Sequence, residues 1–271
     1  MIDIVTVVFE QELPVLRLQA RSIDLYCKDI DNIYVVVNDD SNIINQINPS
    51  WWGYLADRVI ILPRTAFSTT YASNGWLSQQ VLKIMAAAIS YNKWSMVLDA
   101  KTIFVKPFVL EELLDERNRL TVGNMDVYPV FEPSRQIVNK LFNIDLTKQL
   151  GPGGVPFFFH NATVRNMIAT VETLTQESFP NWFQAQGMLT EFLLYSWYLC
   201  YTKADQLYNT TRCDIDVVNI CHSQVVSFDR LFDQMLQQKT QTVSIHRNAW
   251  SALTAEQQQK YINLLDSKGI Q

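Results

Sequence analysis

The segment Trp94-Ser-Met-Val-Leu-Asp-Ala-Lys-Thr-Ile-Phe-Val-Lys-Pro107 decides the expected fold. Residues 96–98 form a continuous apolar run, which is typical of a strand that is covered on both faces. The interior of such a strand is unfavourable for an ion, so we expect Asp99 where the strand stops. In open α/β sheets, ligands bind at that edge. The segment therefore predicts a buried strand that delivers Asp99 and then Lys101 to a ligand site. The alternative is an ordinary solvent-exposed turn after the strand, where aspartate is common.

The first hundred residues alternate between apolar strands and amphipathic helices. Strands are predicted at 2–9, 33–37, 59–62 and 94–99, with helices at 11–27 and 75–90. This alternation indicates a parallel sheet. The second half predicts a loop-rich stretch up to about Pro156, helices at 109–117, 162–175, 188–201, 228–238 and 254–267, and short strands at 215–220 and 242–246. We therefore expect one mixed α/β domain.

Composition and charge exclude several classes of protein. The 271 residues are 48% apolar and 18% charged, as in a folded globular protein. A net charge of −5 without a Lys/Arg-rich run argues against a nucleic-acid binder. The apolar runs are too short for a signal peptide or a transmembrane segment. The four cysteines fit neither a zinc site nor a disulfide framework, so we expect free thiols and a cytoplasmic protein.

A second group of polar residues lies in Ser73-Asn-Gly-Trp-Leu-Ser-Gln-Gln-Val-Leu-Lys83, a turn followed by the start of a helix. Gly75 allows the backbone to approach a ligand closely. Gln79 and Lys83 lie one helical turn apart, with Gln80 next to Gln79. Amides are neutral donors and acceptors that suit sugar hydroxyls or the edge of a base. The alternative is an ordinary amphipathic helix with a polar face.

Glu191 is the candidate for an acid–base role. It lies in the predicted helix 188–201, which is apolar almost all round and should be buried. Burial would raise the pKa of this carboxyl towards the range that suits a general base. The alternative is a structural ion pair, for example with an arginine.

Four motifs follow one another along the chain: Gly75-Trp-x-x-Gln-Gln-x-x-Lys83, Leu98-Asp-x-Lys101, Thr190-Glu-Phe-x-x-Tyr195 and Ser244-Ile-His-Arg247. Their order and spacing resemble those of a largely uncharacterised family of bacterial and viral glycosyltransferases with the GT-A fold. The resemblance covers most of the chain. It implies a single Rossmann-like domain, a mostly parallel sheet flanked by helices, in which residues 1–107 bind the nucleotide and residues 108–271 bind the acceptor.

The resemblance also implies how the donor is held. In nucleotide-sugar glycosyltransferases of this fold, two aspartates at the end of a central strand hold a divalent cation against the donor pyrophosphate. Here Lys101 replaces the second aspartate, which leaves Mn²⁺ or Mg²⁺ in doubt. A lysine can itself supply positive charge to a phosphate. His246 could complete a metal site with Asp99 or donate a hydrogen bond to phosphate beside Lys101.

The predicted site can now be stated in full. The catalytic candidates are Glu191 and Asp99, and the resemblance implies that Glu191 faces the acceptor. The donor-binding candidates are Thr6, Phe9, Asn38, Asn74, Gly75, Gln79, Gln80, Lys83, Lys101, Gly153, Gly154 and His246. The two later glycines come from Gly151-Pro-Gly-Gly-Val-Pro156, which either closes over a substrate or simply connects two elements.

The sequence therefore predicts a glycosyltransferase that moves a hexose from a nucleotide sugar, UDP-linked rather than GDP-linked, to a glycan or other hydroxyl acceptor. The alternative is a non-catalytic nucleotide-sugar or glycan-binding relative that lost its metal motif. The missing second aspartate favours this alternative, and the presence of Glu191 opposes it. A nucleotidyltransferase is less favoured, because residues 6–13 lack the Gly-rich basic loop expected after the first strand.

Overall fold

The computed structural model describes residues 1–38, 42–68, 71, 75–151, 154–211, 216–237 and 239–271. Its centre is a five-stranded sheet in the order β3-β2-β1-β4-β9. The parallel strands are β1 (Ile2–Val8), β2 (Ile30–Val37), β3 (Val59–Pro63) and β4 (Trp94–Asp99), and β9 (Phe157–His160) runs antiparallel to β4. The predicted α/β architecture with a mostly parallel sheet is confirmed. All seven residues of β1 are buried, as expected for a central strand covered on both faces.

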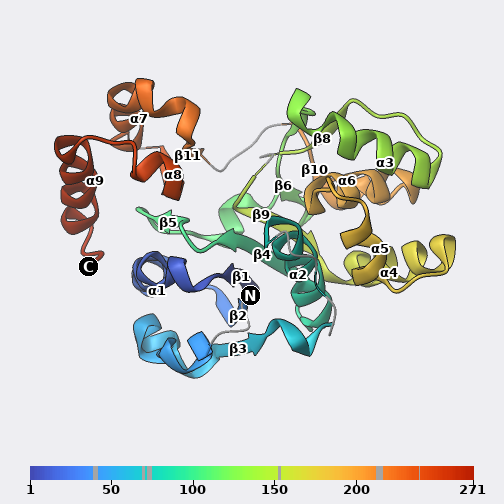
Figure 1. Ribbon diagram of the computed structural model, residues 1–271, viewed down its shortest axis with the longest axis horizontal. Helices are drawn as coiled ribbons and strands as arrows, with labels where there is room; N and C mark the ends of the chain where they lie inside the picture. The colour runs from blue at the N-terminus through green and yellow to red at the C-terminus, as the bar shows by residue number, and fades with distance from the viewer. Residues whose placement is uncertain (39–41, 69–70, 72–74, 152–153, 212–215, 238) are drawn as a thin grey trace.

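The strand order creates a switch point beside β1. The chain adds β2 and β3 on one side of β1 and then returns to add β4 on the other. Right-handed crossovers place α1 (Leu13–Tyr26) and α2 (Gly75–Ile89) on opposite faces of the sheet, as Figure 1 shows. The loops after β1 and β4 therefore part from each other and leave a crevice at the carboxyl edge of the sheet.

Four helices lie on the side of the sheet away from α1 (Figure 1). They are α3 (Glu132–Phe142), α4 (Asn161–Thr175), α5 (Phe179–Ala185) and α6 (Glu191–Tyr201). The helices α4, α5 and α6 pack against α2, and α3 packs against α6. The predicted burial of the segment around Glu191 is confirmed, since nine successive residues of α6, 191–199, are buried. Aromatic side chains fill the space between α6 and the sheet, and the rings of Phe157 and Phe192 stack with centroids 4.2 Å apart.

The C-terminal elements form a second apolar cluster around a small sheet. This sheet has the order β11-β12-β5, formed by β11 (Asp216–Ile220), β12 (Thr240–Ile245) and β5 (Ile103–Phe104). The helices α7 (Phe228–Met235), α8 (Arg247–Trp250) and α9 (Ala255–Ser267) complete the cluster, which packs against Leu18 and Leu25 of α1. In Figure 1 these elements stand together on the α1 side of the molecule. Because β5 follows β4 closely along the chain, it ties the two clusters together.

The remaining elements are short. The further strands are β6 (Leu120–Thr121), β7 (Asn124–Asp126), β8 (Lys148–Leu150) and β10 (Tyr208–Asn209). Short 3₁₀ helices span Glu10–Glu12, Asn42–Gln46, Pro49–Arg58, Arg64–Ala66, Leu110–Leu113, Pro129–Phe131, Asp205–Leu207 and His222–Ser227. Within the described ranges, no helix is both long and apolar enough to cross a membrane. Cys27, Cys200 and Cys221 are free thiols, and Cys213 lies outside the described residues.

Two expectations about local structure were wrong, and two elements were not expected. The stretch before Pro156 is not loop-rich, because it contains α3 and three short strands. Pro133 lies in the first turn of α3, where its missing N–H is not needed. The predicted helix at 109–117 is only a 3₁₀ turn at Leu110–Leu113. The strand β9 and the helix α5 were not expected, because such short apolar segments carry no clear period.

Candidate functional site

A pocket of about 590 Å³ opens at the switch point, outside the carboxyl ends of β1 and β4. Five parts of the chain form its wall: the turn after β1, the start of α2, the end of β4, the turn after β11 and the start of α8. The predicted donor-site residues that line it are Phe9, Gly75, Gln79, Gln80, Lys83, Asp99, Lys101 and His246. The fold thus brings residues from distant parts of the sequence to one crevice.

The other predicted residues lie elsewhere. Thr6 is buried within β1, and Gly154 lies outside the pocket wall. Asn38 is buried and holds the start of α2, because its Nδ2 donates to the Gly75 carbonyl at 3.1 Å and its Oδ1 accepts from Ser78 Oγ at 2.9 Å. Asn74 and Gly153 lie outside the described residues. Asn38 therefore anchors the pocket wall without lining it.

Close packing at the start of α2 favours glycine at position 75. A Cβ atom at this position would lie 3.1 Å from Cε1 of Phe9, which is tighter than an ordinary contact. The missing side chain therefore lets the Phe9 ring pack against the helix and form part of the pocket wall.

Asp99 lies between two lysines at the base of the pocket. Its Oδ1 is 2.7 Å from Lys83 Nζ, and its Oδ2 is 2.6 Å from Lys101 Nζ. Lys83 Nζ also lies 3.0 Å from Oε1 of Glu191, whose side chain is only 1% exposed. The four side chains form an alternating chain of charges, Glu191–Lys83–Asp99–Lys101. We expect this chain to be rigid, because each buried charge has an opposite partner.

The surroundings fix the protonation of this chain of charges. Burial alone would raise the pKa of Asp99, but Lys101 and Lys83 hold it well below its usual range. Burial alone would lower the pKa of Lys83, yet Asp99 and Glu191 raise it above its usual value. For Glu191, burial raises the pKa and Lys83 offsets only part of that effect. Asp99 and Lys83 thus stay charged at neutral pH, and of the two carboxyl groups Glu191 binds a proton more readily than Asp99.

The residues present do not fit a divalent cation. Both carboxylate oxygens of Asp99 face an ammonium group, and a cation there would be repelled by Lys83 and Lys101. No group of three or more His, Cys, Asp or Glu side chains that could hold a metal exists among the described residues. Burial, with help from Lys101, lowers the pKa of His246 to about 4, so its ring is neutral near pH 7. The metal site that the resemblance left open, Asp99 with His246, is therefore not supported.

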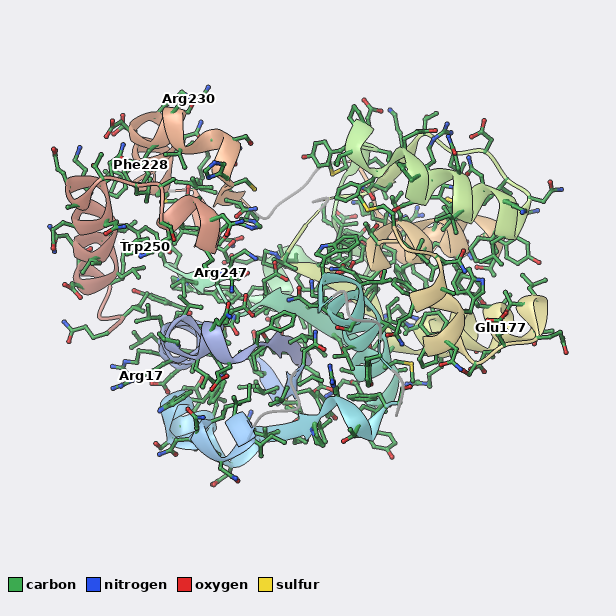
Figure 2. The ribbon with its side chains drawn as sticks, viewed as in Figure 1. Arg17, Glu177, Phe228, Arg230, Arg247 and Trp250 are labelled. Atoms are coloured by element: carbon green, nitrogen blue, oxygen red, sulfur yellow. The ribbon has the colours of Figure 1, made fainter. Side chains whose placement is uncertain are left out.

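Sequence reasoning missed several residues of the pocket, above all Glu12 and Arg247. Glu12 follows β1 in a short 3₁₀ turn, and its Oε2 accepts a hydrogen bond from the Phe9 backbone N–H at 3.2 Å. Burial raises the pKa of Glu12, with Lys101 opposing the rise. Arg247 donates a hydrogen bond to Gln11 from the start of α8 (Figure 2). Arg247 is part of the motif Ser244-Ile-His-Arg247, but only His246 of that motif was a site candidate. For Glu12, the only indication of a site in the sequence is its position shortly after the first strand.

Comparison with known proteins agrees with this geometry at the level of the fold. Residues 7–250 match a protein family described as a family of unknown function, DUF6492. The chain belongs to this family. No curated protein matches the chain.

Two solved structures show the fold of this DUF6492 chain at low sequence identity. One is the galactosyltransferase LgtC in complex with donor and acceptor sugar analogues, at TM-score 0.50 and 11% identity, covering 98% of this chain and 96% of that chain. The other is the apo form of the bifunctional glycosyltransferase WbbM, at TM-score 0.52 and 12% identity, covering 97% of this chain and 49% of that chain. The DUF6492 chain has the GT-A fold.

Proposed function

We propose that this protein is a glycosyltransferase whose donor is a nucleotide sugar bound in the pocket at the switch point. The observation that supports this proposal is the combination, in one crevice, of cationic side chains and amides. Lys101 and Arg247 suit a diphosphate, and Gln79 and Gln80 suit sugar hydroxyls. The fold is that of LgtC, a galactosyltransferase whose structure holds donor and acceptor sugar analogues, which favours the same class of reaction.

In this proposal Lys101 takes over part of the role that a divalent cation has in related folds. Breaking the glycosidic bond leaves negative charge on the diphosphate, and fixed positive groups stabilise it. The Lys101 ammonium has three donors, and Asp99 occupies one of them. The remaining donors can bind phosphate oxygens while Asp99, which Lys83 holds from its other side, keeps the ammonium in place. Donor binding is therefore expected to persist without metal.

The finer parts of the proposal rest on the sequence. The resemblance favours a hexose, a UDP-linked rather than a GDP-linked donor, and a glycan or other hydroxyl acceptor. The division into a nucleotide-binding part, residues 1–107, and an acceptor-binding part, residues 108–271, and the cytoplasmic location are proposals on the same basis. The pocket modifies the proposed division in one respect, because His246 and Arg247 lie in the later part of the chain and yet line the donor pocket.

A second candidate function is non-catalytic binding of a nucleotide sugar or glycan. The observation that favours it is the occupation of both Asp99 oxygens by lysines, which leaves no carboxylate pair for a metal. Binding without turnover would show as donor affinity with no release of nucleoside diphosphate. Measurement of hydrolysis and transfer beside affinity therefore separates the two candidates.

The test is donor affinity by titration calorimetry, with UDP-glucose, UDP-galactose and GDP-mannose, each in EDTA and in Mn²⁺. We expect one UDP-sugar to bind in EDTA with nearly the affinity it has in Mn²⁺. Lys101→Ala should weaken that binding by roughly 10- to 100-fold, the usual size for a lost hydrogen bond to a charged group. The matched control is Lys140→Ala, an exposed lysine on α3 outside the pocket. Absence of binding for every donor in both buffers would refute the proposal.

A further inference from the structure

A second pocket, of about 360 Å³, lies beside the donor pocket between α1, β5, β12, α8 and α9. Its wall is largely apolar and includes Val15, Leu18, Ile103, Ile245, Trp250 and Leu265. Trp250 of α8 packs edge-on against Tyr261 of α9, with ring centroids 6.0 Å apart. An apolar pocket of this size, with few polar groups, has the character of a site for a small organic ligand.

The two pockets meet at a common boundary. Four residues line both of them: Gln11, Glu12, Lys101 and Arg247. Figure 2 shows Arg247 and Trp250 extending from the same short helix, Arg247 towards α1 and Trp250 towards α9. On the donor-pocket side of Arg247 the wall is formed mainly by charged and amide side chains, and on the other side it is formed mainly by hydrocarbon. A molecule that spans the boundary would need a polar part and an apolar part.

We propose that this second pocket binds a hydrocarbon aglycone of the acceptor, with the hydroxyl-bearing part of the acceptor at the boundary. This inference rests on the proposed function and names the class of acceptor for the same site. Hydrocarbon placed against Val15, Ile103 and Trp250 leaves water without loss of hydrogen bonds. The boundary residues can bond the polar part, so no polar group need be buried without a partner.

The nucleobase of the donor is the competing occupant, and the lining disfavours it. A base carries hydrogen-bonding groups along its edge, and burying them without partners is costly. Beyond the four shared boundary residues, the pocket wall is formed by Pro14, Val15, Leu18, Ile103, Ile245, Trp250, Tyr261, Ile262 and Leu265. Among these, only the Tyr261 hydroxyl and the Trp250 indole N–H are polar side-chain groups. A hydrocarbon therefore suits this wall better than a base.

The test uses methyl, butyl and octyl β-D-glucosides, below their micelle concentrations, titrated into the full chain in the presence of UDP. Each methylene that enters the pocket should raise affinity by about four-fold, from about 0.8 kcal/mol per buried methylene, until the pocket is filled. Val15→Trp should fill the space and abolish the gain from chain length. The matched control is Val130→Trp, at a residue 63% exposed and far from the pocket wall, which should keep the gain.

A second variant, Ile262→Trp, keeps the inference testable if Val15→Trp does not fold. Ile262 lines the pocket and is 39% exposed, so Ile262→Trp can enter the pocket without replacing a fully buried side chain. It should also reduce the gain from chain length. Equal affinity for all three glucosides in a chain that binds UDP would overturn this inference alone. Loss of UDP binding in both Val15→Trp and Ile262→Trp would show that the pocket binds the nucleobase, and this result would also overturn the inference. Failure of UDP itself to bind would count against the proposed function.

Discussion

Lys83 is the residue on which the charges of the site depend. It is buried, and its ammonium contacts one carboxylate in the pocket, Asp99, and one behind it, Glu191. Removing one member of such a group leaves an uncompensated buried charge, which typically costs about 3–5 kcal/mol. From the sequence we predicted that Lys83 binds the donor and that Glu191 acts as a base. The contacts favour a different division, in which Glu191 holds Lys83 and Lys83 holds Asp99 in place.

Glu12 is the carboxylate better placed to accept a proton from an acceptor. It lines the pocket at its boundary, whereas Glu191 does not line it. The charged groups that face Glu12 are Lys101, Asp99 and Arg247. Because burial raises the pKa of Glu12, a base role would make activity rise with pH through a value above that of an ordinary glutamate.

We predict that Glu12→Gln lowers kcat by roughly 10²- to 10⁴-fold, the usual size for loss of a general base, and removes the acid limb of the pH–rate profile. Donor affinity should change little. The paired variant is Glu191→Gln, which should lower the melting temperature and weaken donor binding through Lys83. Rates and calorimetry on both variants give the answer. A selective loss of kcat in Glu191→Gln, with normal donor affinity and unchanged stability, would restore Glu191 as the catalytic base.

At the scale of elements, the start of α6 determines where Glu191 lies. Thr190 is the N-cap of this helix, and its side chain accepts a hydrogen bond from the Leu193 N–H at 3.3 Å. Glu191 is the first residue of the helix, so the cap sets the position of its carboxylate relative to Lys83. The helix α9, which contributes no residue to the wall of the donor pocket, has the same type of cap at Thr254, which accepts from the Gln257 N–H at 3.2 Å.

We predict that Thr190→Ala and Thr254→Ala each cost about 0.5–2 kcal/mol in the free energy of unfolding, the usual range for loss of an N-cap. Only Thr190→Ala should also weaken donor binding, because only that cap positions a residue of the chain of charges. Urea unfolding and calorimetry measure the two effects, and Thr190→Ser keeps the acceptor as a control. Equal donor affinity in both alanine variants would show that the cap of α6 has no bearing on the site.

At the scale of the whole molecule, the donor pocket joins the two apolar clusters. Its wall takes Phe9 and Gln79 from elements of the central sheet layer and His222, His246 and Arg247 from the C-terminal elements. The two clusters also meet through β5 and through Leu18 and Leu25 of α1. A ligand in this pocket would bind to both parts at once and so stabilise their association.

We predict that UDP at about 100 times its Kd stabilises the native state by about 2.7 kcal/mol, as mass action requires, and that the effect extends to both clusters. Hydrogen exchange should slow in β12 and α8 as well as in β1 and α2. Adenosine, which lacks a diphosphate, serves as the control. Slower exchange confined to residues 1–107 would contradict the role of the C-terminal elements in the donor pocket.

The sequence by itself determined the four parallel strands of the central sheet and the strand end at which Asp99 lies. Continuous apolar runs in β1 and β4 fixed which segments are covered on both faces, and that burial forced Asp99 to the strand end. The turn and helix start at 73–83 gave Gly75 and Gln79 as further candidates, and these line the same pocket as Lys101. These expectations held because burial of a short segment is a local property, and parallel strands bring their carboxyl ends to one edge.

Only the tertiary structure decided which side chains pair across that edge. Lys83 and Glu191 lie 108 residues apart, and their contact depends on how α6 packs against α2. Glu12 and Arg247 line the same two pockets only because the C-terminal elements pack against α1. The apolar pocket depends on the same packing. Periodicity reports the face that a helix buries and does not report the partner it meets, because many partners bury that face equally well.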